Sequence, residues 1–260
     1  MHFKTLFILS ILAFSCNDNV MLGKIEKHNT PLTGISPLPD NPYPSINDIP
    51  LPGGFNRLSG DAFAEYLRHI SLKKSKTVFK FNGLPKENQT AQFAVLDISV
   101  GDKDLQQCAD AVMRLRAEYL FAAGEFSQIR FTDNEHHVYQ FAPLYSKENL
   151  GRYLQQVFGM CGSASLSKQL HPVASFNAIQ PGDVIIRGGF PGHAVMVVDV
   201  AQNASGEKIF LLAQSYMPAQ DIHVLVNPID ENLSPWYKVS NEKLIHTPEY
   251  LFNNEELKRW

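Results

Sequence analysis

The stretch PGDVIIRGGFPGHAVMVVDV (residues 181–200) decides the expected fold. It contains two short apolar runs, 183–188 and 193–200, and Gly188, Gly189 and Gly192 lie around Pro191 just before the second run. Runs of this length that are rich in Val and Ile and bounded by Gly and Pro are typical of buried strands. The stretch therefore predicts two consecutive strands, and His193 is the first residue of the second.

The surrounding sequence predicts an α+β domain. Two further strand-like runs follow at 208–214 and 221–227, and an earlier one lies at 93–100. Helical patterns cover about 61–70, 105–123 and 147–160, and residues 127–131 and 137–141 suggest a hairpin. Helices first and consecutive strands later favour helices packed on an antiparallel sheet.

Cys108 lies in the segment DLQQCADAVM (residues 104–113). Asp104 is the expected N-cap of this helix, with Gln107 three residues later, which places Cys108 in the first turn. Free amides and the helix dipole at that position stabilise an anion and lower the pKa of a thiol. Three interpretations remain open here: a nucleophile, a buried core residue, or a disulfide with Cys161. The helix is apolar around most of its circumference, so we expect it to pack deep in the domain.

His193, at the open end of a buried strand, suits a general base. If 193–200 and 208–215 form a hairpin with Val200 facing Lys208, His193 lies opposite Ser215 and beside Gln214. Gln214 is therefore the first candidate for orienting the imidazole, and Gln220, Asp221 and His223 are alternatives.

The N-terminal third predicts export. MHFKTLFILSILAFSC (residues 1–16) has Lys4, a short apolar run and a small-residue end, and resembles a bacterial lipoprotein signal in which Cys16 is lipidated. A plain secretory signal is the alternative. Residues 17–54 are rich in Pro and predict a semi-rigid linker, followed by one domain at 55–260. We expect a lipid anchor in the cell envelope.

Composition excludes some classes of partner. The net charge is −3 and no basic stripe with interleaved aromatic residues is present, so we expect no nucleic-acid partner. His136 and His137 are adjacent on an expected strand and point to opposite faces, so we expect no metal and no other cofactor.

The order of a Cys at a helix start, PGDVII and then GHAVMVV resembles NlpC-type cell-wall peptidases, within the papain-like cysteine hydrolases. The resemblance implies that Cys108 attacks, His193 relays the proton and Gln214 orients His193. This chain departs from the family by having Gln-Cys-Ala-Asp at the nucleophile.

A second resemblance covers more of the chain. DLQQCADAVMRLRAEYL, PGHAVMVVDV and LLAQSYMPAQ resemble a family of bacterial exported proteins catalogued as a domain of unknown function. It adds candidate substrate-binding or oxyanion residues: Gln107, Arg116, Ser215, Gln220 and His223. The expected function is a lipid-anchored cysteine hydrolase acting on a cell-wall peptide or a related amide, and the alternative is a non-catalytic envelope binding module of the same fold.

Overall fold

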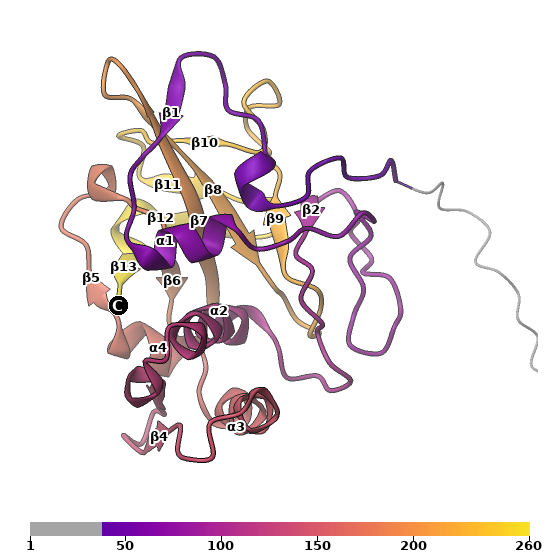
Figure 1. Cartoon of the computed structure of the whole chain (residues 1–260). Helices are drawn as coiled ribbons and strands as arrows, with labels where there is room; N and C mark the ends of the chain where they lie inside the picture. Colours follow the sequence, from indigo (N-terminus) through magenta and orange to yellow (C-terminus); the bar gives the residue numbers. More distant parts are fainter. Residues whose placement is uncertain (1–37) are drawn as a thin grey trace, which may run out of the picture. The chain divides into compact units, whose positions relative to one another are not determined.

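A large antiparallel sheet forms the centre of the protein, whose computed structural model describes residues 38–260 (Figure 1). Its strands run in the order β2-β9-β8-β7-β6-β13-β5, with β1 added to β7 and β10 to β8. Their bounds are β1 (Phe55–Arg57), β2 (Gln92–Val95), β5 (His171–Pro172), β6 (Val184–Arg187), β7 (His193–Asn203), β8 (Lys208–Gln214), β9 (His223–Leu225), β10 (Tyr237–Lys238) and β13 (Leu257–Arg259). The expected mixture of helices and antiparallel sheet is confirmed.

Residues 38–260 also contain four α-helices, two small hairpins and four single-turn 3-10 helices, which are Ile46–Asp48, Phe126–Gln128, Phe176–Ala178 and Asn254–Glu256. The α-helices are α1 (Ala62–Arg68), α2 (Cys108–Ala122), α3 (Lys147–Met160) and α4 (Ser163–Gln169). The hairpins are β3 (Arg130–Thr132) with β4 (Val138–Gln140), and β11 (Leu244–His246) with β12 (Leu251–Asn253). Among the described residues, no helix is long and apolar enough to cross a membrane.

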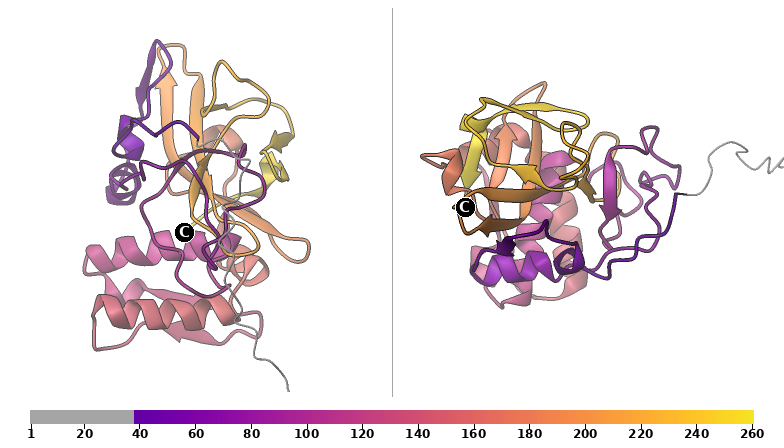
Figure 2. Two further views of the ribbon diagram at one scale, coloured as in Figure 1. Left: turned by 90° about the vertical axis from the view of Figure 1, so that its right-hand side faces the viewer. Right: turned by 90° about the horizontal axis from the view of Figure 1, so that it is seen from above.

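The two faces of the sheet carry separate apolar clusters. Ala194, Met196 and Val198 of β7 belong to the cluster that contains α1 and α2. Val195 and Val197 point the other way and pack with Phe252 of β12. This alternation follows from the period of two in a strand. Figure 2 shows the result from above, with α1 and α2 on one side of the sheet and the β11–β12 hairpin on the other.

The folded unit begins earlier than the sequence suggests. Residues 38–260 form one unit, so the boundary expected at residue 55 is too late. Ile46 and Ile49 are at most 1 % exposed, and the indole N–H of Trp236 donates to the carbonyl of Pro50 at 2.8 Å. Residues 38–54 are therefore not a linker, because scattered apolar side chains among the prolines reach the core. The expected signal peptide, Cys16 and the rest of the linker lie outside the described residues.

The start of the cysteine helix also differs from the expectation. The helix begins at Cys108, with Gln107 as N-cap, and Asp110 accepts from the Gln107 backbone N–H at 2.9 Å. Asp104 is not the cap, because its carboxylate instead accepts from the Ala219 N–H at 2.7 Å. The Asp104 carboxylate, which the capping pattern requires, is thus bound by a backbone amide from a distant part of the chain.

The β7–β8 hairpin forms in a shifted register. Val200 faces Phe210 rather than Lys208, because β7 continues to Asn203 and shortens the loop. A bulge between Val197 and Asp199 then moves the pairing back by one residue. Pairing ends at Met196 with Ala213, so His193 has no partner on β8 and faces Arg187 of β6 instead.

Candidate functional site

The thiol of Cys108 lies where β7 and β8 separate. Beyond Gln214 the chain leaves β7, and the hydroxyl of Ser215 lies 2.8 Å from the carbonyl oxygen of Gln106, next to the start of α2. The backbone N–H groups of Ala109 and Ala194 lie close enough to the Cys108 sulfur to favour its thiolate form. Since Ala194 follows His193 directly, the helix start brings the thiol to the first residues of β7.

Burial changes the chemistry of this thiol. Cys108 is 8 % exposed, and burial, followed by the nearby Asp110 carboxyl, raises its pKa to about 11. The expectation of a lowered pKa at the helix start is therefore wrong for this structure. The amide donors favour the thiolate, but the loss of hydration outweighs them. Cys161 is also a buried free thiol with a pKa raised to about 11 by burial, so these two cysteines do not form a disulfide here.

The raised pKa predicts slow alkylation of Cys108. Only the thiolate reacts, and a pKa two units above the ordinary value of 9.0 leaves about 100-fold less of it at pH 7. In a Cys161→Ala variant, iodoacetamide should label Cys108 about 100-fold more slowly at pH 7 than in the urea-unfolded chain, with a tenfold rise per pH unit towards pH 10. Mass spectrometry of the peptide gives the rates. Equal rates in the folded and unfolded chains would contradict the raised pKa.

His193 is held by Gln214. The two side chains are 1 % exposed, and Nε2 of His193 lies 2.8 Å from Oε1 of Gln214. The other end of the Gln214 amide, Nε2, donates to the Glu249 carboxylate at 2.9 Å. Because a carboxylate can only accept, this contact fixes the orientation of the amide. His193 therefore carries its proton on Nε2, which leaves Nδ1 as the basic atom.

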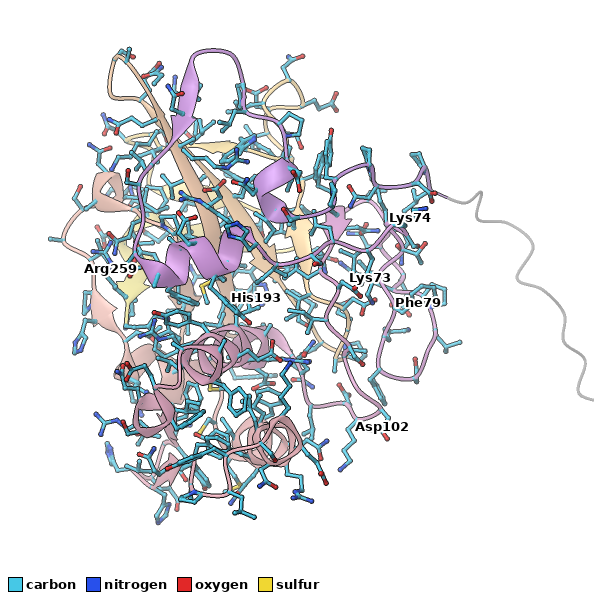
Figure 3. The ribbon with its side chains drawn as sticks, in the orientation of Figure 1. Lys73, Lys74, Phe79, Asp102, His193 and Arg259 are labelled. Carbon is cyan, nitrogen blue, oxygen red and sulfur yellow. The ribbon has the colours of Figure 1, made fainter. Side chains whose placement is uncertain are left out.

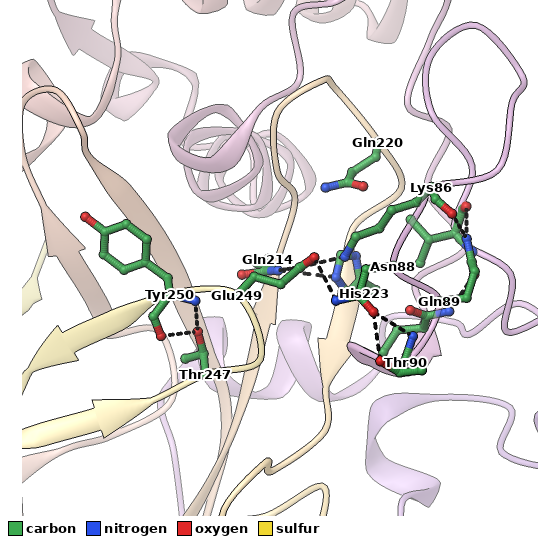
Figure 4. Close-up of polar contacts among 12 residues, drawn as sticks. Lys86, Asn88, Gln89, Thr90, Gln214, Gln220, His223, Thr247, Glu249 and Tyr250 are labelled. Atoms are coloured by element: carbon green, nitrogen blue, oxygen red, sulfur yellow. Dashed lines mark hydrogen bonds and ion pairs between the residues drawn. The ribbon is translucent and has the colours of Figure 1, made fainter.

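Two loops far apart in sequence complete this buried polar network (Figure 4). Nζ of Lys86 lies 2.6 Å from Oε2 of Glu249, and both side chains are largely buried. His223 donates from Nδ1 to the carbonyl of Asp221 at 2.9 Å, so its Nε2 faces the Gln214 amide at 3.4 Å as an acceptor. Gln214 thus contacts two imidazoles and one carboxylate.

Burial keeps both imidazoles neutral. It lowers the pKa of His193 to about 4, against the opposing effect of the Gln214 acceptor. It lowers the pKa of His223 to about 3, helped by the ammonium of Lys86. At neutral pH, therefore, the imidazole of His193 is unprotonated and the thiol of Cys108 is protonated.

Aromatic rings surround the imidazole of His193. Tyr216 and Tyr250 lie with ring centroids 4.8 and 5.0 Å from it, and Phe252 lies at 5.7 Å. Burial, then Glu249 and Cys108, raises the pKa of Tyr216. Tyr216 therefore packs against the imidazole and is near enough to Cys108 for a thiolate there to raise the Tyr216 pKa.

A cavity of about 160 Å³ opens beside the thiol. Cys108, Asp110 and Cys161 line it together with the turn before β7. Burial raises the pKa of Asp110 to about 8, so this carboxyl is largely protonated at neutral pH. Phe190, 95 % exposed, and Met217, 50 % exposed, also line the cavity and offer an apolar surface at its mouth.

Gly192 is required for the approach of that turn. A Cβ at this position would lie 2.3 Å from both the Gly189 carbonyl oxygen and the Ser163 hydroxyl. No side chain fits such a distance, so the residue before His193 must be glycine.

The other predicted site residues make structural contacts. The side-chain amide of Gln107 donates to the Asp104 carboxylate at 3.1 Å, and the hydroxyl of Ser215 lies 2.8 Å from the backbone carbonyl oxygens of both Gln106 and Gln220. Gln220 is 2 % exposed and its carbonyl accepts from Ser215. Arg116 is not part of the site: it lies about 12 Å further along α2 and its guanidinium packs against three rings. These rings belong to Phe63, Tyr119 and Trp260.

The comparisons with known proteins identify a family. Its model, described as a domain of unknown function (4846), matches residues 46–143 and 132–259. The chain belongs to this family. No curated protein and no solved structure matches it. The match also begins inside the segment that the sequence suggested to be a linker, in agreement with the buried Ile46.

In this family member, sequence reasoning missed several residues of the site. Glu249 and Lys86 lie in loops with no recognisable pattern, and Tyr216 follows the predicted Gln214 and Ser215 unnoticed. Asp110 was also missed, but a sequence signal for it exists, because its spacing of three from Gln107 is that of a capping residue. No group of three or more His, Cys, Asp or Glu among residues 38–260 could hold a metal.

Proposed function

We propose that the protein is a cysteine hydrolase of the cell envelope, anchored by lipid on Cys16, that cleaves an amide in a cell-wall peptide or a related molecule. One observation carries the proposal: the Cys108 sulfur lies against the amide of Ala194 while the preceding His193 is held by Gln214. A nucleophile, a base and a group that orients the base are the three parts of such a site.

The finer fold assignment, a papain-like domain of the NlpC type, belongs to the same proposal. It is supported by the order of the parts: a cysteine at the first residue of a helix, a histidine at the first residue of a strand, and a glutamine on the neighbouring strand. The resemblance in sequence implies the same three roles for the same three residues.

The reaction would run as an acyl transfer. Nδ1 of His193 takes the thiol proton, and the sulfur of Cys108 adds to the substrate carbonyl. The carbon–nitrogen bond then breaks, and the imidazolium returns the proton to the leaving amine. Water, activated by the same Nδ1, hydrolyses the thioester and restores the thiol.

Backbone amides are the best candidates for holding the oxyanion. The first N–H groups of a helix have no carbonyl partner within it, and those of Cys108 and Ala109 lie at the thiol. The Gln107 side chain is bound to Asp104 instead. Because the resting pair is neutral, the thiol proton would pass to Nδ1 as the sulfur adds to the substrate carbonyl, without a stable thiolate in the resting site.

Cleavage of peptidoglycan stem peptides, followed by mass spectrometry, tests the proposal. Cys108→Ala and His193→Ala should each lower the rate by at least about 10³-fold, whereas the matched buried thiol variant Cys161→Ala should keep it. A trapped thioester would add the mass of the acyl fragment to Cys108. Full activity of Cys108→Ala would refute the hydrolase.

A second function is favoured by the raised pKa of Cys108. A buried, protonated thiol suits a non-catalytic envelope module that binds its ligand at the same cavity, with Phe190 and Met217 as its apolar surface. In that case no variant cleaves anything, and Cys108→Ser sediments with insoluble cell walls as well as the wild type does.

A further inference from the structure

A second cavity lies away from the thiol, between α2, α3 and the segment 99–106. We call it the α2–α3 groove; its volume is about 740 Å³, within the range of sites that bury small organic ligands. α2 and α3 run side by side along it in Figures 1 and 2. Phe158 lines both the groove and the cysteine cavity, but the site described above does not use the groove.

The walls of the α2–α3 groove are apolar. Six large side chains supply them: Tyr66, Leu105, Phe121, Leu150, Leu154 and Phe158. On α3 the spacing of Leu150, Leu154 and Phe158 places one helix face along the groove. Walls of this kind favour an alkyl or aromatic body rather than a sugar or a polar peptide.

The charges at the groove leave a positive excess. Arg114 is neutralised by Glu118, 2.8 Å away. Lys103 and Lys147 have no ion-pair partner among the described residues; Lys103 only hydrogen-bonds to the Gln155 amide at 2.9 Å. The remaining carboxylate, Asp102, is exposed at the outer tip of its loop in Figure 3. An anionic head therefore suits the mouth and a cationic head does not.

We infer that the α2–α3 groove binds an amphipathic anion, with an alkyl or aryl body between the helices and a carboxylate-like head at Lys103 and Lys147. The inference stands apart from the proposed hydrolase, because it needs neither Cys108 nor His193. Cys108→Ala should bind such a ligand as the wild type does, so failure of one idea leaves the other intact.

Gly151 offers a sharp test. It lines the groove, and a Cβ built on it meets no atom within 4 Å, so a side chain can begin there without a clash. Gly159 lies on the same helix with equally open space but does not line the groove. Gly151→Trp should therefore block the site, and Gly159→Trp is its matched control.

The probe is dodecanoate, titrated by calorimetry into the full chain. We expect one site per chain, binding lost in Gly151→Trp and kept in Gly159→Trp, and affinity at least about tenfold weaker in Lys147→Glu. Dodecyltrimethylammonium should not bind. Equal binding to both glycine variants, equal binding of the cationic detergent, or no binding of dodecanoate to the wild type would each overturn the inference.

Discussion

Replacing Asp199 with alanine should lower the free energy of unfolding by about 3–5 kcal/mol, the usual cost of removing one partner from a buried ion pair. Asp199 is fully buried on β7, and its carboxylate binds Arg57 and Arg68 at 2.7 Å each. These contacts fasten β1 and α1 to the central strand. Without the carboxylate, two guanidinium groups lose their main counter-charge in a largely dry environment.

Urea denaturation measures the loss, and the chain offers a contrasting control. Glu148 and Arg152 form an exposed pair on α3 at 3.1 Å, so Glu148→Ala should cost no more than about 0.5 kcal/mol. Asp199→Asn, which keeps the shape and removes the charge, should fall between the two. A loss below about 1 kcal/mol for Asp199→Ala would mean that the pair is not buried as described.

The second large effect concerns acid. His193 and His223 have pKa values of about 4 and about 3 when folded, below the ordinary 6.5. At a pH between the folded and the ordinary pKa of each imidazole, the unfolded chain binds a proton there and the folded chain does not. The free energy of unfolding therefore decreases as the pH falls from 6.5 towards 4. Each histidine contributes a slope of about 1.4 kcal/mol per pH unit. Asp110 acts in the opposite direction, because its folded pKa is raised to about 8.

Comparing the pH dependence of the free energy of unfolding in His223→Gln and in the wild type isolates the contribution of one imidazole. Over pH 4.5–6, the free energy of unfolding of His223→Gln should depend on pH less steeply than that of the wild type, by about 1.4 kcal/mol per unit. The contribution of Asp110 cancels in this comparison. His246→Gln, at an exposed position on β11, should keep the wild-type slope. An unchanged slope in His223→Gln would show that this imidazole is not held neutral.

Much of the fold could be predicted because local signals and burial agree. β8 and α3 have their expected bounds, and Ser146 caps α3 by accepting from the Asn149 N–H at 3.2 Å. The short strands β1, β5, β10 and β13 were not predicted. Two or three residues carry no periodic pattern, and these strands form only where a neighbouring strand pairs with them: β1 with β7, β10 with β8, β13 with β6 and β5 with β13.

The candidate site divides in the same way. The closeness of His193 and Gln214 could be predicted, because they lie on two adjacent strands. The expected register was wrong, but side chains near a strand end can reach more than one residue of the neighbouring strand. Glu249 and Lys86 could not, because their contact joins loops 163 residues apart. Arg116 was misplaced because its position in a family motif suggested a site residue, whereas its guanidinium packs among aromatic rings.

The sequence by itself determined the longer strands and helices, and that a cysteine lies at a helix start while a histidine starts a buried strand. These properties depend on neighbours along the chain. Only the tertiary structure decided the protonation states of the Cys108 thiol and the His193 imidazole. The helix start favours a thiolate, but burial around Cys108 and His193 disfavours both charged forms, and burial depends on side chains brought together from the whole chain.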